Sequence, residues 1–141
     1  TTVGYDKLDR PVTARNPRNE VATTVYDAAD NPVRVIDPRG KATAQRFDAL
    51  NQLVSVTDPL GHVTKFGYTV LGRVSGVTDP LGQATGVTND PLGRPRATTD
   101  PLAHTTTTTY DARGQAVAVT DALGHTTTTV YDALGQAVEV R

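Results

Sequence analysis

The residue types that catalysis needs are scarce in this sequence. Ser55 and Ser75 are the only serines, and there is no cysteine. Neither serine lies in a nucleophile elbow, the sharp turn between a strand and a helix that exposes a catalytic serine. A serine or cysteine triad would need chance assembly from the other residues. We therefore predict that the chain is not an enzyme and has no catalytic residue.

His62, His104 and His125 are the side chains best suited to bind a transition metal. They occupy one position, just after a turn, of a repeat that is 21 residues long. If each repeat forms two strands, His104 and His125 stand about 9 to 10 Å apart, which is too far for two ligands of one zinc ion at about 2 Å each. We expect these histidines to be polar residues that flank turns, and we expect no metal and no cofactor.

Aspartates recur at two positions of the repeat, and stacked Asp loops bind calcium in some repeat proteins. Here each of these aspartates begins a turn, where its carboxylate can accept hydrogen bonds from nearby backbone N–H groups. The pattern favours a structural role for the aspartates over calcium binding.

Threonine forms two runs, at residues 105–109 and 126–129. One explanation is the β propensity of threonine together with cross-strand threonine pairs. The other is the attachment of O-linked glycans to an extracellular fibre, for which Thr106, Thr108, Thr127 and Thr129 are the candidates. Both interpretations stay open at the level of the sequence.

The repeat that positions these side chains runs through the whole chain, with no insertion or deletion in its period of 21 residues. An aromatic marker begins nearly every repeat: Tyr5, Tyr26, Phe47, Tyr68, Tyr110 and Tyr131, with Asn89 in the one remaining place. Asp follows every marker except Tyr68, which Thr69 follows. We interpret residues 1–141 as a single array of repeats that begin near residues 5, 26, 47, 68, 89, 110 and 131.

The fourth place after each marker selects a backbone angle. It holds only Asp, Asn or Gly, the residue types that adopt the left-handed region at the lowest cost. These residues are Asp9, Asp30, Asn51, Gly72, Gly93, Gly114 and Gly135. We predict that the segment after each marker is a turn that ends in a left-handed residue.

A second turn is predicted in the other half of each repeat. Asp comes first, Pro usually second and Gly usually fourth, which fits a type I turn that ends in a left-handed residue. These turns begin at Asp37, Asp58, Asp79, Asp100 and Asp121, and they end at Gly40, Gly61, Gly82, Ala103 and Gly124. In the first repeat, Asn16 and Asn19 take the corresponding places.

The segments between turns are too short for helices and are rich in Val and Thr, so we predict strands. Val alternates in the first strand of a repeat, as at Val33 and Val35, and a row of threonines that includes Thr43 should share a face with the markers. The predicted fold is an all-β meander of antiparallel hairpins. About 13 strands at roughly 4.8 Å spacing would form a sheet on the order of 60 Å wide, which should coil into part of a shell, barrel or tube.

Charge and composition restrict the partners. The formal net charge is -1 and Lys and Arg are scattered, so we expect neither nucleic acid nor a membrane surface as a partner. No apolar run approaches the roughly 20 residues of a membrane-spanning helix. The sequence contains no methionine, and we expect it to be a fragment of a larger repeat protein or a processed product.

The repeat closely resembles the YD repeat of Rhs proteins, Tc-toxin shell subunits and teneurins. The resemblance rests on the segment that begins with Tyr131 and Asp132, and on the turn from Asp121 to Gly124 with His125 and Thr127 behind it. It extends over essentially the whole chain and departs from the family pattern at Thr69, Asn89 and Ala103. In that family the repeats form hairpins that spiral into a hollow shell, which in bacterial toxins encloses a toxic C-terminal segment. The autoproteolytic region of the family has no match here, so no residue inherits a catalytic role.

The resemblance implies a structural scaffold: a wall segment of an Rhs-like secreted protein that encapsulates a toxic cargo. The alternative is an extracellular filament, tube or adhesion segment built from stacked repeats. The expected partners are further repeats of the parent chain or identical copies, joined through open strand edges around Val3 and Val138, and an encapsulated polypeptide. The expected location is outside the cell or at its surface.

Overall fold

The computed structural model describes residues 1–141 as strands joined by turns, without a helix. The all-β prediction is confirmed. The chain divides into two compact bodies, which we describe separately: the first contains residues 1–66 and 79–81, and the second contains residues 67–78 and 82–141. A membrane-spanning helix is absent.

The first body contains the strands β1 (Thr2–Tyr5), β2 (Pro11–Arg15), β3 (Val21–Tyr26), β4 (Pro32–Ile36), β5 (Ala42–Phe47), β6 (Leu53–Thr57) and most of β7 (Val63–Tyr68). The second body contains β8 (Val74–Thr78), β9 (Ala84–Asn89), β10 (Pro95–Thr99), β11 (Thr105–Tyr110), β12 (Ala116–Thr120), β13 (Thr126–Tyr131) and β14 (Ala137–Val140). The chain thus has 14 strands, against the 13 or so predicted, because β1 precedes the first turn.

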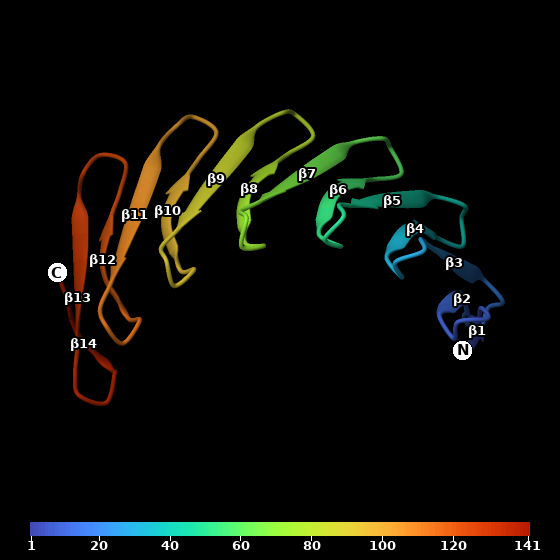
Figure 1. Ribbon diagram of the computed structural model, residues 1–141, viewed down its shortest axis with the longest axis horizontal. Helices are drawn as coiled ribbons and strands as arrows, with labels where there is room; N and C mark the ends of the chain where they lie inside the picture. Colours follow the sequence, from blue (N-terminus) through green and yellow to red (C-terminus); the bar gives the residue numbers. More distant parts are fainter. The chain divides into compact units, whose positions relative to one another are not determined.

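Within each body, strands that follow one another in the sequence pair antiparallel, as predicted. Figure 1 shows the hairpins that result. Where the marker pairs with the next strand, the register shifts at a β-bulge, as at Tyr26 and Tyr110. That the complete sheet coils stays a prediction.

The turns have the predicted backbone. Positive φ angles occur at eight glycines and at five other residues, Asp9, Asn19, Asp30, Asn51 and Ala103, and all of them are at the predicted left-handed positions. Ala103 has a φ of 66°, and this left-handed backbone is unfavourable for a residue with a Cβ. Gly124, in the equivalent position with a φ of 87°, has no Cβ and avoids that strain. Departures from the repeat pattern do not abolish the turns, since the N–H of Gly72 still donates to the carbonyl of Thr69 at 2.9 Å.

The two faces of each sheet differ in composition. Val35 pairs with Thr43, Val56 with Thr64 and Val119 with Thr127, and the markers share this face because side chains alternate along a strand. The Thr row and the markers share a face, as predicted, and the pairing places the Val row on it as well; we call it the marker face. The opposite face of the second body carries small residues, such as the row Ala97, Thr107, Thr120 and Thr126.

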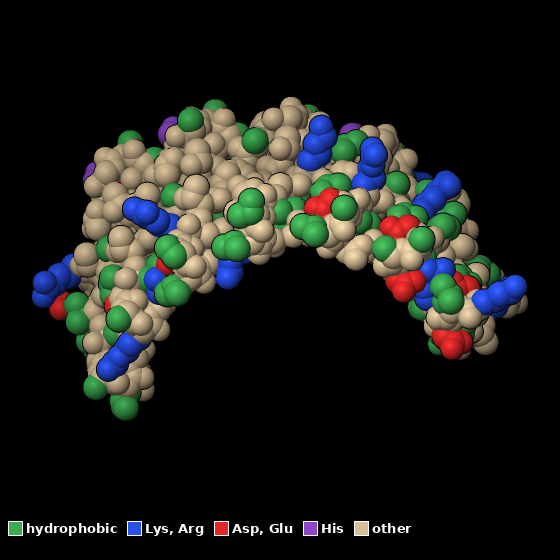
Figure 2. All heavy atoms as spheres, viewed as in Figure 1, with side chains coloured by type: hydrophobic (Ala, Val, Ile, Leu, Met, Phe, Trp, Pro, Cys, Tyr) green, Lys and Arg blue, Asp and Glu red, His purple; other side chains and the backbone are tan.

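Neither body has a buried hydrophobic side chain, and Ser55, at 9% exposure, is the one buried residue. Leucines in the turns are largely exposed, up to 84% at Leu134. Figure 2 shows hydrophobic side chains at the surface among polar groups and backbone. The ladder of backbone hydrogen bonds and contacts between neighbouring strands therefore hold each sheet together, because no apolar core contributes.

Candidate functional site

The repeated turns are the part of the chain where polar side chains gather. We call the turns after the markers the marker turns and the others the second turns. In both kinds an aspartate at the first place accepts backbone hydrogen bonds with its side chain, as when Oδ1 of Asp111 accepts from the N–H groups of Arg113 at 2.9 Å and Gln115 at 2.8 Å. Asn16 does the same through its amide oxygen. These are the local hydrogen bonds expected of an aspartate that begins a turn, and a structural role for the aspartates stays a prediction.

In five of the marker turns, the residue that follows the left-handed position reaches the marker turn of the next repeat. Arg10 donates to the carbonyl of Asp27 at 3.0 Å and to the carboxylate of Asp30 at 2.7 Å. The amide of Asn31 donates to Asn51 at 2.8 Å. In these contacts a side chain, and not only the backbone ladder, joins one repeat of the first body to the next.

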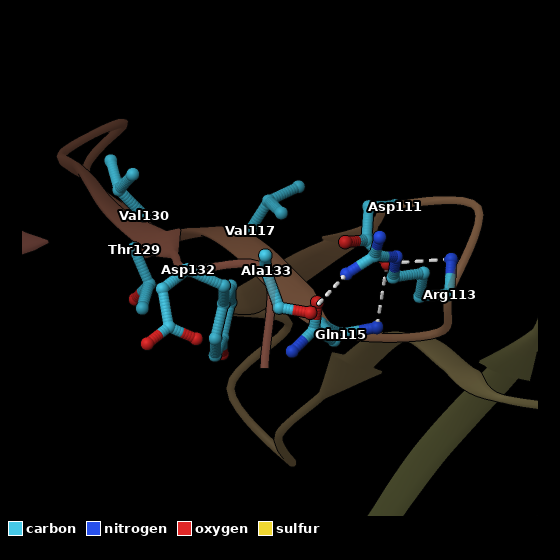
Figure 3. A pocket seen from close by; sticks show the side chains of 9 residues that line it. Asp111, Arg113, Gln115, Val117, Thr129, Val130, Asp132 and Ala133 are labelled. Carbon is cyan, nitrogen blue, oxygen red and sulfur yellow. Dashed lines mark hydrogen bonds between the residues drawn. The ribbon is translucent and has the colours of Figure 1, made fainter. Parts of the chain in front are cut away.

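The second body repeats this arrangement. Arg73 donates to the carbonyl of Gly93 at 3.2 Å, and Gln115 donates to the carbonyl of Gly135 at 3.1 Å. Figure 3 shows the end of this row, where Arg113 also donates to the carbonyl of Ala133 at 3.2 Å. An open hollow lies beside these groups, lined by side chains that include Asp111, Gln115, Val117, Thr129 and Tyr131.

We name these side chains the bridging residues: Arg10, Asn31, Arg73, Arg94 and Gln115. The sequence prediction missed them. A signal was present, because the place after the left-handed position holds only long or amide side chains that can donate hydrogen bonds: Arg10, Asn31, Gln52, Arg73, Arg94, Gln115 and Gln136.

The marker tyrosines also join neighbouring strands. The hydroxyl of Tyr110 donates to the carbonyl of Pro95 at 2.8 Å, and that of Tyr131 donates to the carbonyl of Ala116 at 3.0 Å. Asn89, which replaces the aromatic marker, reaches the carbonyl of Val74 with its amide at 3.5 Å. At Tyr110, Tyr131 and Asn89 the marker position thus supplies a donor directed at the start of the preceding strand, whereas Phe47 has no such group.

Two bridging arginines also contact marker rings. The guanidinium carbon of Arg10 lies 4.9 Å from the ring centroid of Tyr26, and that of Arg94 lies 4.4 Å from the ring centroid of Tyr110. Cations in this position are attracted by the face of the ring. The marker and the bridging residue therefore form one contact between successive repeats.

The three histidines lie in second turns, as predicted, each beside the aspartate of its own turn. Nδ1 is 2.8 Å from Asp58 in His62, 2.9 Å from Asp100 in His104 and 3.0 Å from Asp121 in His125. No group of three or more His, Cys, Asp or Glu side chains is arranged to hold a metal ion.

Hydrogen bonds at these turns stabilise the ionised carboxylates. The side-chain hydrogen bond from His62 lowers the pKa of Asp58 below its usual value. The backbone N–H of His104 lowers the pKa of Asp100, and that of His125 lowers the pKa of Asp121. Each of these aspartates therefore contributes more to stability as a carboxylate than as an acid.

The threonines named as glycan candidates divide by exposure. Thr106 and Thr127 are exposed, whereas Thr108 and Thr129 are half-buried. All four lie on the marker face, because Thr106 and Thr108 alternate with Tyr110 in β11 and Thr127 and Thr129 alternate with Tyr131 in β13. Glycan attachment stays a prediction.

The chain matches the family model of the RHS repeat at residues 5–43, 26–56, 47–84, 90–126 and 110–141. These matches take in nearly the whole array and keep the register of the markers. No curated protein sequence matches the chain.

Several solved structures share the fold. A crystal structure of TcdB2-TccC3-TEV matches with a TM-score of 0.72 and 16% identity over 94% of this chain and 8% of that chain. The Tc holotoxin pore of Photorhabdus luminescens matches with a TM-score of 0.71 and 16% identity over 86% of this chain and 7% of that chain. A crystal structure of TcdB2-TccC3 matches with a TM-score of 0.61 and 12% identity over 97% of this chain and 7% of that chain. The chain thus spans less than a tenth of the length of these proteins.

Proposed function

Because the chain belongs to the RHS repeat family, we propose that it is a wall segment of a larger, secreted Rhs-like protein that encloses a polypeptide cargo. Its role is structural, and we assign it no catalytic activity. Its partners are further repeats of the parent chain, joined through strand edges, and the enclosed polypeptide.

The observation that carries this proposal is the single-layer sheet without a buried hydrophobic side chain. A sheet of this kind separates two spaces and encloses no core of its own. In the first body the strand residues of the marker face are all uncharged, among them Val35, Val56, Thr43, Thr64 and Phe47. Such a face can lie against an extended polypeptide without requiring a specific charge in that polypeptide.

The neighbours support the same proposal. One structure that shares the fold is described as a Tc holotoxin pore with a mutation in TccC3, and another as TcdB2-TccC3-TEV, which also names TccC3. A toxin acts on another cell, which supports a location outside the producing cell.

The test uses the complete parent protein and limited proteolysis. We expect the segment that follows the repeats to resist digestion in the intact protein and to become cleavable when the wall is opened by Gly61→Val, which places a β-branched residue at a φ of 89°. Leu60→Ser in the same turn is the control, because Leu60 is 76% exposed and its loss should leave the wall closed.

If that segment is cleaved in the intact protein as fast as in the Gly61→Val variant, encapsulation is overturned. Filaments of the parent protein with the repeat continuing from copy to copy would overturn it in favour of an extracellular fibre. The sequence of the parent gene separates the same two functions, since a toxin needs a variable segment after the repeats.

A further inference from the structure

Basic side chains gather on the face of the first body that lies opposite the marker face. Arg46 of β5 pairs with Ser55 of β6, and Ser55 pairs with Lys65 of β7. The three residues therefore form one row across adjacent strands, with Ser55 in the middle. Arg34 of β4 lies on the same face, since it pairs with Ala44, two residues before Arg46.

The same row lines a hollow. It is lined by Arg46, Ser55, Thr57, Val63 and Lys65, together with Phe47 and Val54. The Cα atoms of Arg46 and Lys65 stand two strand spacings apart, roughly 10 Å, so both long side chains can reach a group placed above Ser55. Ser55 lies between the two cations, and Thr57 lies two residues further along β6, between Ala44 and Val63.

No carboxylate neutralises these cations. All aspartates of the chain lie outside the strands, and Glu139 in β14, in the other body, is the one acidic residue within a strand. The ion pairs of the chain involve Arg10, Arg94, Arg141 and the three histidines, and none involves Arg34, Arg46 or Lys65. In Figure 2 the blue side chains at the upper edge over this body lie apart from the red carboxylates, while others lower down lie beside them.

We propose that Arg46, Ser55 and Lys65 form a binding site for a tetrahedral oxyanion, a phosphate or sulfate group. A guanidinium and an ammonium supply donors and positive charge only, and two hydroxyls add further donors, so the ligand must be rich in acceptor oxygens. Two cations match the two negative charges of such a group, whereas a single carboxylate of an acidic peptide uses one of them. This site does not depend on the wall function.

Lys and Arg are scattered in the sequence. Arg46 and Lys65 are far apart in the sequence, and only the pairing of β5, β6 and β7 brings them into one row. The site is therefore defined by the register of the strands.

The test is equilibrium dialysis of the chain against labelled phosphate or labelled sulfate, with chloride keeping the ionic strength constant. We expect saturable binding of about one anion per chain, weakened about fivefold to tenfold by Arg46→Gln and by Lys65→Gln, since each removes a charged donor. Lys65→Arg keeps the charge and should retain binding. Arg15→Gln is the matched control, because Arg15 lies in the same body but pairs with Val21, away from the hollow.

Further outcomes decide the chemistry. A phosphomonoester and a sulfated disaccharide compete with the label if the site takes the group from a larger ligand, and the stronger competitor identifies the source. Acetate competing as well as sulfate would overturn the oxyanion assignment in favour of an acidic peptide. Binding that is not saturable, or that Arg15→Gln weakens as much as Arg46→Gln, would overturn the site. Circular dichroism confirms that each variant keeps the strands.

Discussion

Exchanging alanine and glycine between two equivalent turns tests the left-handed position directly. Ala103 and Gly124 are 21 residues apart and have φ angles of 66° and 87°. Their turn hydrogen bonds match, at 3.0 Å from the N–H of Ala103 to Asp100 and 3.1 Å from that of Gly124 to Asp121. No atom lies within 4 Å of the place that a Cβ would take at Gly124, so Gly124→Ala changes only the backbone preference.

The magnitude follows from two opposing terms. An L-residue in the left-handed region costs roughly 1 to 2 kcal/mol. Glycine gives back about 0.4 to 1 kcal/mol, because it makes the unfolded chain more flexible. Ala103→Gly should therefore raise the free energy of unfolding by about 0.5 to 1 kcal/mol, and Gly124→Ala should lower it by a similar amount.

The assay is urea denaturation followed by circular dichroism, at one protein concentration for all variants. Hydrogen exchange of the amides of residues 103 and 124 reports the same effect locally, as a change of about twofold to fivefold in the opening equilibrium. The double variant should return to the stability of the original chain, within about 0.5 kcal/mol. A loss of stability in Ala103→Gly, or a gain in Gly124→Ala, would refute the argument from backbone angle.

Three further predictions concern single side chains. Tyr110→Phe removes a hydroxyl that donates to the carbonyl of Pro95 at 2.8 Å, and it should lower the free energy of unfolding in urea by about 0.5 to 1.5 kcal/mol. An unchanged free energy would mean that the aromatic ring, and not the hydroxyl, accounts for the stability that the marker contributes. Gly93→Ala should destabilise the chain more than Gly124→Ala in the same measurement, because a Cβ there would displace the guanidinium of Arg73; equal losses would show that the bridging contact adds no stability. The pKa of Asp121 is lowered in the fold, so its contribution is present above the ordinary pKa of about 3.9 and is lost as the pH falls through the lower folded value. Asp121→Asn should lower the melting temperature at pH 7 and flatten its dependence between pH 5 and pH 2, so that the variant and the original chain converge in acid; an acid limb as steep as in the original chain would contradict the linkage.

The turns were predictable because their requirements are local. A left-handed angle restricts the residue type directly, so the recurrence of Asp, Asn and Gly was enough to find the positions of Asn51 and Gly72. Ala103 was predictable by position although its residue type argues against a positive φ. Thr69 keeps its turn because the backbone hydrogen bonds and its Oγ1, which accepts from the N–H of Arg73 at 3.2 Å, replace what Asp supplies elsewhere.

The contacts between repeats were harder to predict, because they depend on which strands lie side by side. Gln115 and Gly135 are distant in the sequence, and only the stacking of two marker turns brings them to 3.1 Å. The row of Arg46 and Lys65 needed the register of three strands for the same reason. Side-chain alternation groups residues within one strand, whereas the pairing partner decides which groups meet across strands.

The restriction of contacts to consecutive strands has a consequence for how such a chain can change over generations. Deleting or duplicating one whole repeat of 21 residues leaves the partners of every remaining strand of the same kind as before, since each hairpin meets only hairpins like itself. Recombination between repeated stretches of the gene can therefore lengthen or shorten the array by whole repeats, and no strand loses its pairing partner in the process. Inserting or deleting one residue within a strand would instead turn the side chains that follow in that strand to the opposite face of the sheet. This accounts for a period that is kept without insertion or deletion.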